Sequence, residues 1–247
     1  PSGEGRSKGA LTISCSEMAK MTHGKVIIDR SDTGFPSSDL SKAVPVLRQR
    51  YGQVCLLLNS GSGRSLTPLL DAQQMARYIS SSGKTKDFRI TLSTSNPVSS
   101  LGKLASKYGN IMTISGREND SISIESNEFR SHGIMEDIFT LGSGLVFQGM
   151  AEAMSQQTSS DRILSITNNL SSEISTLTND FIESPFFKTL LEELEQRKSC
   201  FFAGLGSGRE VARMSAIRVA HVKHALSDEV FVSGESSTPS PRAGDVL

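Results

Sequence analysis

Short apolar runs alternate along this chain with longer stretches in which apolar residues recur at helical spacing. The short runs are mostly free of polar interruptions, as in strands that are covered on both faces of a sheet. They lie at residues 25–29, 54–59, 88–93, 111–115, 200–203 and 229–233. Helical patterns occupy residues 66–80, 98–107, 134–154, 161–197 and 211–225. We expect a break near Pro185, because proline disrupts helix interiors.

Strands that alternate with helices predict parallel βαβ units with right-handed crossovers. The pattern therefore predicts the α/β class. Residues 117–130 (RENDSISIESNEFR) are polar and irregular, which is typical of a surface loop.

The chain also repeats itself over a long distance. The sequence GEGRS at residues 3–7 has a counterpart, GSGRE, at residues 206–210. Each is expected to open a helix with an Ala-x-x-x-His ending, followed by a short strand and a Ser/Thr/Pro-rich loop. This order predicts two copies of one domain, at residues 1–157 and 158–247. The first copy would lack its opening helix and strand, and the second would hold the first half of the domain. Both ends of the chain look like cuts.

Charge and cysteine content narrow the function classes. Acidic and basic residues number 26 each, and no basic block or acidic tail points to nucleic acid or to a membrane surface. No apolar stretch approaches the ~18 residues of a membrane span, and no secretory signal is apparent. The 3 cysteines form no CxxC pair, which favours reduced thiols and a cytoplasmic location.

The most informative motif is NSGSGRS, which follows the apolar run 54–59 and precedes a helical pattern. At such a junction the first N–H groups of the helix are unpaired, and the helix dipole adds a partial positive charge. Glycines permit close backbone approach to an anion, and hydroxyls donate further hydrogen bonds. The candidate phosphate site consists of Ser60, Gly61, Ser62, Gly63, Arg64 and Ser65. The alternative is a Gly/Ser turn with N-capping serines and no ligand.

A second glycine-rich stretch, FFAGLGSGRE, raises the possibility of dinucleotide binding. The GxGxxG fingerprint requires a third glycine, but that position holds Arg209. The motif therefore matches that of a nicotinamide-dependent oxidoreductase only poorly. We keep this function as a hypothesis beside those developed below.

Taken together, these motifs resemble the sugar isomerase (SIS) domain family. The resemblance rests on GxGRS, SGSGRS, SSLGKLASKYGNIMTISGR and HGIME in the first copy, and on GESSTPSPRAGD in the second. Within the superfamily the chain is most similar to the 6-phospho-3-hexuloisomerases. The resemblance implies a three-layer α/β/α sandwich around a mainly five-stranded parallel sheet, of the flavodoxin-like or Rossmann-like kind. It also implies no metal and no organic cofactor, and a homo-oligomer or tandem-domain pseudo-dimer.

The resemblance also implies roles for individual residues. Glu136 matches the proposed catalytic base, and His23 or His224 matches the proposed ring-opening or proton-relay histidine. Arg6, Arg209 and Glu235 match positions near the bound sugar phosphate. The base would remove a proton next to the carbonyl of a ketose phosphate and form an enediolate, which needs a raised carboxyl pKa. From the residues alone, the pattern favours an exposed acid at a helix N-terminus for Glu136 and a helix C-terminal residue interacting with the dipole for His23.

Two departures from the family pattern keep a non-catalytic interpretation open. The first copy carries SDTGFPSSD where the second has the Glu–Thr–Pro loop, and the second copy has no SGSG loop within this sequence. The alternative is a regulatory SIS module that binds a phosphosugar without turning it over.

Overall fold

The computed structural model describes residues 1–21, 27–30, 34–116, 130–131, 134–135, 138–196 and 198–246. Contacts divide the chain into two compact units, unit 1 from Pro1 to Phe147 and unit 2 from Gln148 to Leu247. The division falls within one helix, before the boundary that the repeat predicts at 157/158. The two-copy interpretation itself stays a prediction.

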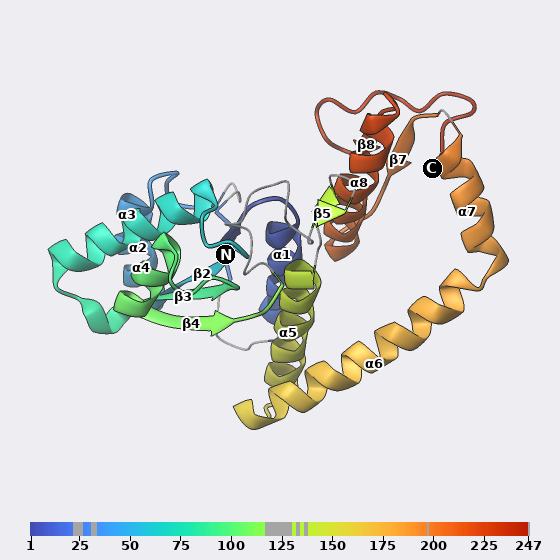
Figure 1. The fold of residues 1–247 in the computed structure, drawn as a ribbon. Coiled ribbons are helices and arrows are strands. Elements are labelled where there is room, and N and C mark those ends of the chain that lie inside the picture. Colours follow the sequence, from blue (N-terminus) through green and yellow to red (C-terminus); the bar gives the residue numbers. More distant parts are fainter. Residues whose placement is uncertain are drawn as a thin grey trace. The chain divides into compact units, whose positions relative to one another are not determined.

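The sheet of unit 1 has four parallel strands, in the spatial order β1, β2, β3, β4 (Figure 1). They span Ser2–Gly3, Val54–Asn59, Phe88–Thr94 and Gly109–Thr113. The α/β class and the three later strands are therefore confirmed. The first strand is a surprise, because Ser2 and Gly3 were expected to belong to a glycine loop.

A five-stranded sheet is not shown. Of the strand expected at 25–29, residues 25 and 26 lie outside the described residues, and residues 27–29 form no strand. At the end of β2, both edges of the strand are already paired. One edge of β2 pairs with β3, and β1 already pairs with the other edge at Leu58 and Asn59. Asp29 instead forms an ion pair with Lys8, at 4.0 Å.

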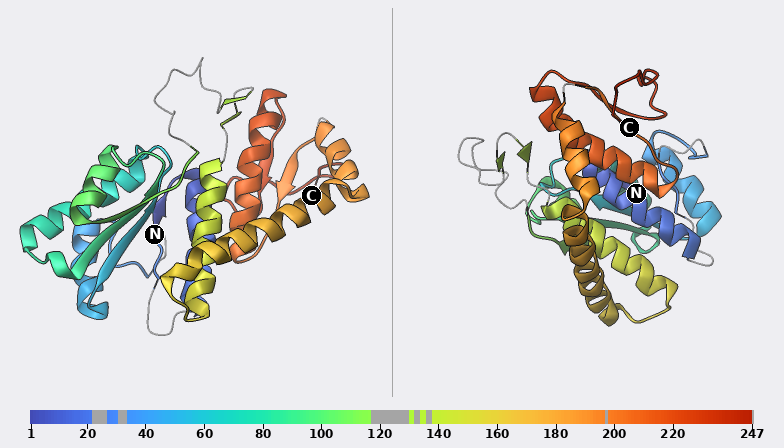
Figure 2. Two further views of the ribbon diagram at one scale, coloured as in Figure 1. Left: turned by 60° about the horizontal axis from the view of Figure 1, so that its bottom comes forward. Right: turned by 90° about the vertical axis from the view of Figure 1, so that its right-hand side faces the viewer.

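Helices cover both faces of this sheet (Figures 1 and 2). The helices α2 (Leu40–Tyr51), α3 (Leu66–Ser82) and α4 (Ser100–Tyr108) lie on one face. On the other face lie α1 (Gly5–Met21) and the start of α5 (Ile138–Ser155). The main core fills the space between the sheet and the first set of helices. Its fully buried members include Leu58, Ile90 and Leu92 from the sheet, and Met75 and Leu101 from α3 and α4.

Local signals explain where these helices begin. Ser99 caps α4, because its hydroxyl accepts a hydrogen bond from the Gly102 amide at 3.1 Å. Asp39 caps α2 in the same way through the Ser41 amide, at 2.9 Å. The sequence pattern did not reveal α2, because Pro45 interrupts it. The helix nevertheless forms, since Leu40, Ala43 and Val44 bury one face of it in the core.

The described part of unit 2 holds a βαβ arrangement, the last part of α5 and two further helices. The parallel strands β7 (Cys200–Phe202) and β8 (Val230–Val232) flank α8 (Ser207–Ala225). The helices α6 (Ile163–Ile182) and α7 (Pro185–Glu195) meet at a corner, where Ser184 accepts a hydrogen bond from the Phe187 amide at 3.2 Å. The break expected near Pro185 is confirmed. Two short 3-10 turns, Thr85–Asp87 and Ser160–Arg162, complete the described elements.

The helix expected at 134–154 begins later than predicted. Ile134–Met135 forms β6, which pairs with β5 (Arg130–Ser131) in an antiparallel ladder. This pairing commits residues 134 and 135 to extended backbone, so α5 starts at Ile138. Among the helices of the described part, none combines the length and the apolar character needed to cross a bilayer.

The cysteines are expected to differ sharply in reactivity. Burial raises the pKa of the Cys15 thiol to about 11 and also raises the pKa of Cys200, whereas the side chain of Cys55 is exposed. A raised thiol pKa means that the reactive thiolate forms only at higher pH. Short iodoacetamide pulses at pH 8 should therefore modify Cys55 first, as read by mass spectrometry. In urea all three should react, and native labelling of Cys15 at the rate of Cys55 would contradict its burial.

Candidate functional site

The glycine-serine loop lies where the sequence placed it, between the end of β2 and the start of α3. It is anchored to the neighbouring strand by two backbone hydrogen bonds. The Ser60 amide donates to the Ser93 carbonyl at 3.0 Å, and the Ser95 amide donates to the Gly61 carbonyl at 2.9 Å. The loop therefore sits at the edge where the parallel strands end, which is where α/β sheets bind ligands.

Some polar groups of the loop form hydrogen bonds with one another, and others are available to a ligand. The hydroxyls of Ser60 and Ser65 bond to each other at 2.8 Å, and the Ser62 hydroxyl accepts from the Arg64 amide at 3.3 Å. Across the described residues, no protein acceptor bonds the amides of Ser62, Ser65 and Leu66. The adjacent amides of Ser65 and Leu66 at the start of α3, with the Ser62 amide and the exposed Arg64 in the loop before them, are suited to an anion.

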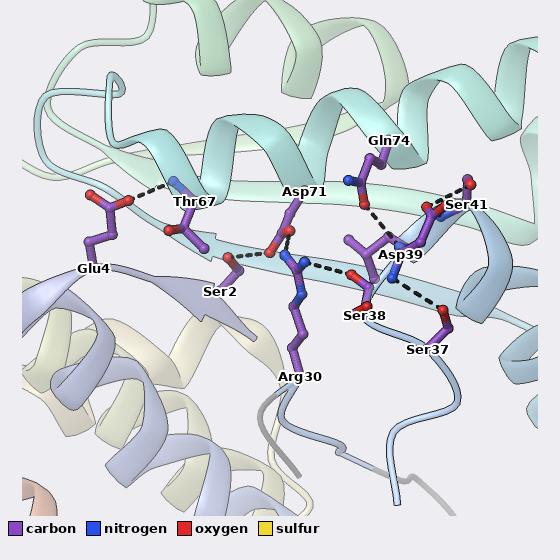
Figure 3. Close-up of polar contacts among 11 residues, drawn as sticks. Ser2, Glu4, Arg30, Ser37, Ser38, Asp39, Ser41, Thr67, Asp71 and Gln74 are labelled. Atoms are coloured by element: carbon purple, nitrogen blue, oxygen red, sulfur yellow. Dashed lines mark hydrogen bonds and ion pairs between the residues drawn. The ribbon is translucent and has the colours of Figure 1, made fainter. Parts of the chain in front are cut away.

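A carboxylate of the protein already shares this helix terminus. Glu4, in the GEGRS motif, accepts a hydrogen bond from the Thr67 amide at 2.6 Å (Figure 3). Thr67 is in the first turn of α3, where a negative charge is stabilised by the helix dipole. Because Glu4 is exposed, its charge is the nearest described competitor for an incoming phosphate. Sequence reasoning missed this role, because Glu4 occupies a variable position of its motif.

A buried ion pair lies one turn further along α3. The carboxylate of Asp71 is 1 % exposed and pairs with the Arg30 guanidinium, and it accepts from the Ser2 hydroxyl at 2.7 Å (Figure 3). Arg30 also donates to the Ser38 carbonyl at 2.6 Å. This network ties the segment before α2 and strand β1 to α3. Asp71 falls on the apolar face of α3. A charged residue at such a position is a sequence signal that could have identified this buried ion pair.

Asn59, the last residue of β2, joins three elements below the loop. Its amide group donates to the Ser7 carbonyl at 2.9 Å and to the Ser143 hydroxyl at 3.0 Å, and its oxygen accepts from Ser93 at 2.5 Å. The start of α1, with the buried Arg6, is thereby held against the end of β2. Asn59 is fully buried, and the sequence analysis did not identify its role. The available signal was a polar residue at the end of an otherwise apolar strand.

In unit 2 the structure brings two of the predicted residues close together. Arg209, in the first turn of α8, donates to the Gly234 carbonyl at 3.3 Å, next to Glu235. Glu235 is paired with Arg213 at 3.4 Å. His224 lies in the last turn of α8, about 22 Å from Arg209 along the helix at ~1.5 Å per residue. Unit 2 by itself therefore does not bring His224 to the Arg209 and Glu235 cluster.

The remaining predicted catalytic residues, His23 and Glu136, lie outside the described residues. Their roles stay predictions. Within the described part, no group of three or more His, Cys, Asp or Glu side chains is arranged to hold a metal ion.

No family model matches this sequence, and no curated protein matches it significantly.

Proposed function

We propose that the chain binds a sugar phosphate at the loop 60–65 and isomerises it, as an SIS domain of the 6-phospho-3-hexuloisomerase kind would do. The observation that carries this proposal is the set of amides of Ser62, Ser65 and Leu66, for which the described residues supply no acceptor. They lie at the end of a buried parallel strand and the start of a helix, where anions bind. The Ser62 hydroxyl, which keeps its own proton, one proton of the Ser60–Ser65 hydroxyl pair and the Arg64 side chain add donors around them. The fifth strand of the SIS sheet and a cytoplasmic location belong to the same proposal.

The proposed reaction interconverts two ketose phosphates through an enediolate. Glu136 acts as the base that takes a proton from the carbon next to the carbonyl, and returns it to the neighbouring carbon. His23 or His224 assists ring opening or proton relay. The proposed phosphate site and base belong to the first predicted copy, whereas Glu235 belongs to the second.

The second candidate is a regulatory module that binds the phosphosugar without turnover. One observation favours it. In place of the Glu–Thr–Pro loop, unit 1 has a segment in which Arg30 is engaged by the buried Asp71. An arginine held in this way supports the fold beside the loop and supplies no acid or base. Turnover assays with Glu136→Gln separate the candidates, since an isomerase loses activity and retains binding.

Binding is tested by thermal shift and calorimetry with pentose, hexose and hexulose phosphates, using the unphosphorylated sugars as controls. Ser62→Ala should weaken binding by about 1 kcal/mol. Glu4→Gln should tighten binding about two- to fivefold at low salt, because it removes a negative charge from the first turn of α3. The Glu4 effect should fade in about 1 M NaCl, where surface charges are screened. Phosphorylated and plain sugars that bind alike, or not at all, would remove the loop assignment.

A further inference from the structure

Charge is strongly segregated along this chain, although the total is balanced. Residues 72–116 contain 6 Lys and Arg but 1 acidic residue, Asp87, which pairs with Arg48 at 2.5 Å. Residues 163–195 show the reverse, with 6 Asp and Glu and 1 Lys. The first segment spans most of α3 with α4, and the second spans α6 with α7. Two surfaces of opposite charge attract one another over about 10 Å at moderate salt.

The basic segment carries an open groove of about 680 Å³ between α3 and α4. We call it the basic groove, and its principal lining residues are Ala76, Arg77, Ser80, Leu104, Lys107 and Tyr108. Its apolar surface comes from Ala76, Leu104 and the Tyr108 ring, over which the Lys107 ammonium lies 5.1 Å from the ring centre. Arg77 and Lys107 carry its charge, and no carboxylate occurs among its described lining residues. The groove therefore fits an apolar side chain flanked by acids.

The acidic segment displays such a group at the corner between α6 and α7. We call Asp180, Phe181, Ile182, Glu183 and Phe186 the acidic corner. Phe181 is 41 % exposed, Ile182 is 50 % exposed and Phe186 is 64 % exposed. The rings of Phe181 and Phe186 lie 6.0 Å apart, so they form one exposed aromatic surface. Exposed aromatic residues that cluster in this way are typical of binding surfaces.

We propose that the acidic corner of one chain docks into the basic groove of a second copy. Phe186 enters the groove between α3 and α4, while Asp180 and Glu183 face Arg77 and Lys107 of the other copy. The reversed charge of the two segments identifies the partner, because one chain supplies both complementary surfaces. The two surfaces differ, so the contact is heterologous, and it closes into a dimer when each copy fills the groove of the other. This association is independent of the proposed phosphosugar binding.

Sedimentation velocity on the full chain tests the proposal through a charge swap. One variant combines Arg77→Glu with Lys107→Glu, and the other combines Asp180→Lys with Glu183→Lys. Each is expected to weaken self-association about tenfold or more, and an equimolar mixture of the two should restore association. Phe186→Ala should weaken it to a similar extent. The wild-type association should weaken in about 1 M NaCl.

Two matched variants control for unspecific charge effects. Glu173→Lys reverses a charge on α6 outside the acidic corner, and Lys84→Glu reverses a charge outside the lining of the basic groove. Both should associate like the wild type, and circular dichroism should confirm that all variants are folded. A wild-type chain that stays monomeric at every concentration overturns the proposal. So does a mixture of folded charge-swapped variants that fails to associate.

Discussion

Replacing Lys223 with methionine is expected to lower the free energy of unfolding of unit 2 by about 3 kcal/mol or more. The Lys223 side chain is 2 % exposed, and its ammonium pairs with Asp228 at 2.9 Å. It also donates to the Leu194 carbonyl at 3.1 Å and to the Gln196 carbonyl at 2.7 Å. Methionine keeps most of the volume, but it leaves a carboxylate and two carbonyls without their cation. Removing one partner of a buried pair is far more costly than removing both.

Urea unfolding followed by circular dichroism measures this loss, and hydrogen exchange localises it. Amides at the end of α7 and along α8 should lose protection first, because Lys223 joins these two helices. Lys198→Met is the matched control, since Lys198 is 34 % exposed and forms a surface pair with Glu193. The double variant Lys223→Met with Asp228→Asn should recover part of the loss. Equal stability of the two lysine variants would show that the buried pair does not hold unit 2 together.

Gly63→Ala is expected to destabilise unit 1 by about 3 kcal/mol and to abolish phosphosugar binding. Gly63 has a φ of +65°, and a Cβ there would lie 2.6 Å from the Cβ of Ser99 and closer still to its hydroxyl oxygen. Ser99 cannot move freely, because it caps α4 through the Gly102 amide. Relief of the clash must therefore shift the loop 60–65 and displace the proposed phosphate donors.

A variant at a second glycine separates the destabilisation caused by the positive φ from the destabilisation caused by the clash with Ser99. Gly83 has a φ of +68°, and a Cβ added to it would meet no atom within 4 Å, so Gly83→Ala should cost only about 1 kcal/mol. The double variant Gly63→Ala with Ser99→Gly should recover the part of the stability loss that comes from the steric clash, although it also removes the N-cap of α4. Chemical denaturation and calorimetry with a sugar phosphate give both readouts. If the two single glycine variants lose equal stability, the packing of Gly63 against Ser99 is not tight.

Much of the fold follows from local pattern. Short, largely apolar runs predicted β2 and β3 closely, and the run at 111–115 located β4 within two residues. Pro185 predicted the corner between α6 and α7, because its ring cannot continue a helix. The position of the loop 60–65 also followed from sequence, since glycine and serine residues end the apolar run before them and favour a turn ahead of the helix.

The sequence pattern mispredicted the backbone conformation where strand pairing decides it. Ser2 and Gly3 are too few and too polar to predict a strand, yet the edge of β2 accepts them. Residues 134 and 135 read as the start of a helix, but their pairing with 130 and 131 keeps them extended. The partner of Ser2 and Gly3 lies far away in the chain, so no local window contains it. Residues 130 and 131 lie close to 134 and 135, but a helical periodicity of apolar residues does not register such a pairing.

By itself, the sequence determined the α/β class, the order of most elements and the junction that holds the candidate phosphate site. These depend on periodicity and on the backbone preferences of glycine and proline, which act within a few residues. The tertiary structure alone decided that Glu4 shares the start of α3, that Asp71 binds Arg30, and that Asn59 joins β2 to α1. Each of these contacts joins residues far apart in the chain. For Asp71 and Asn59, burial of the polar group selects whichever partner the packed fold brings near.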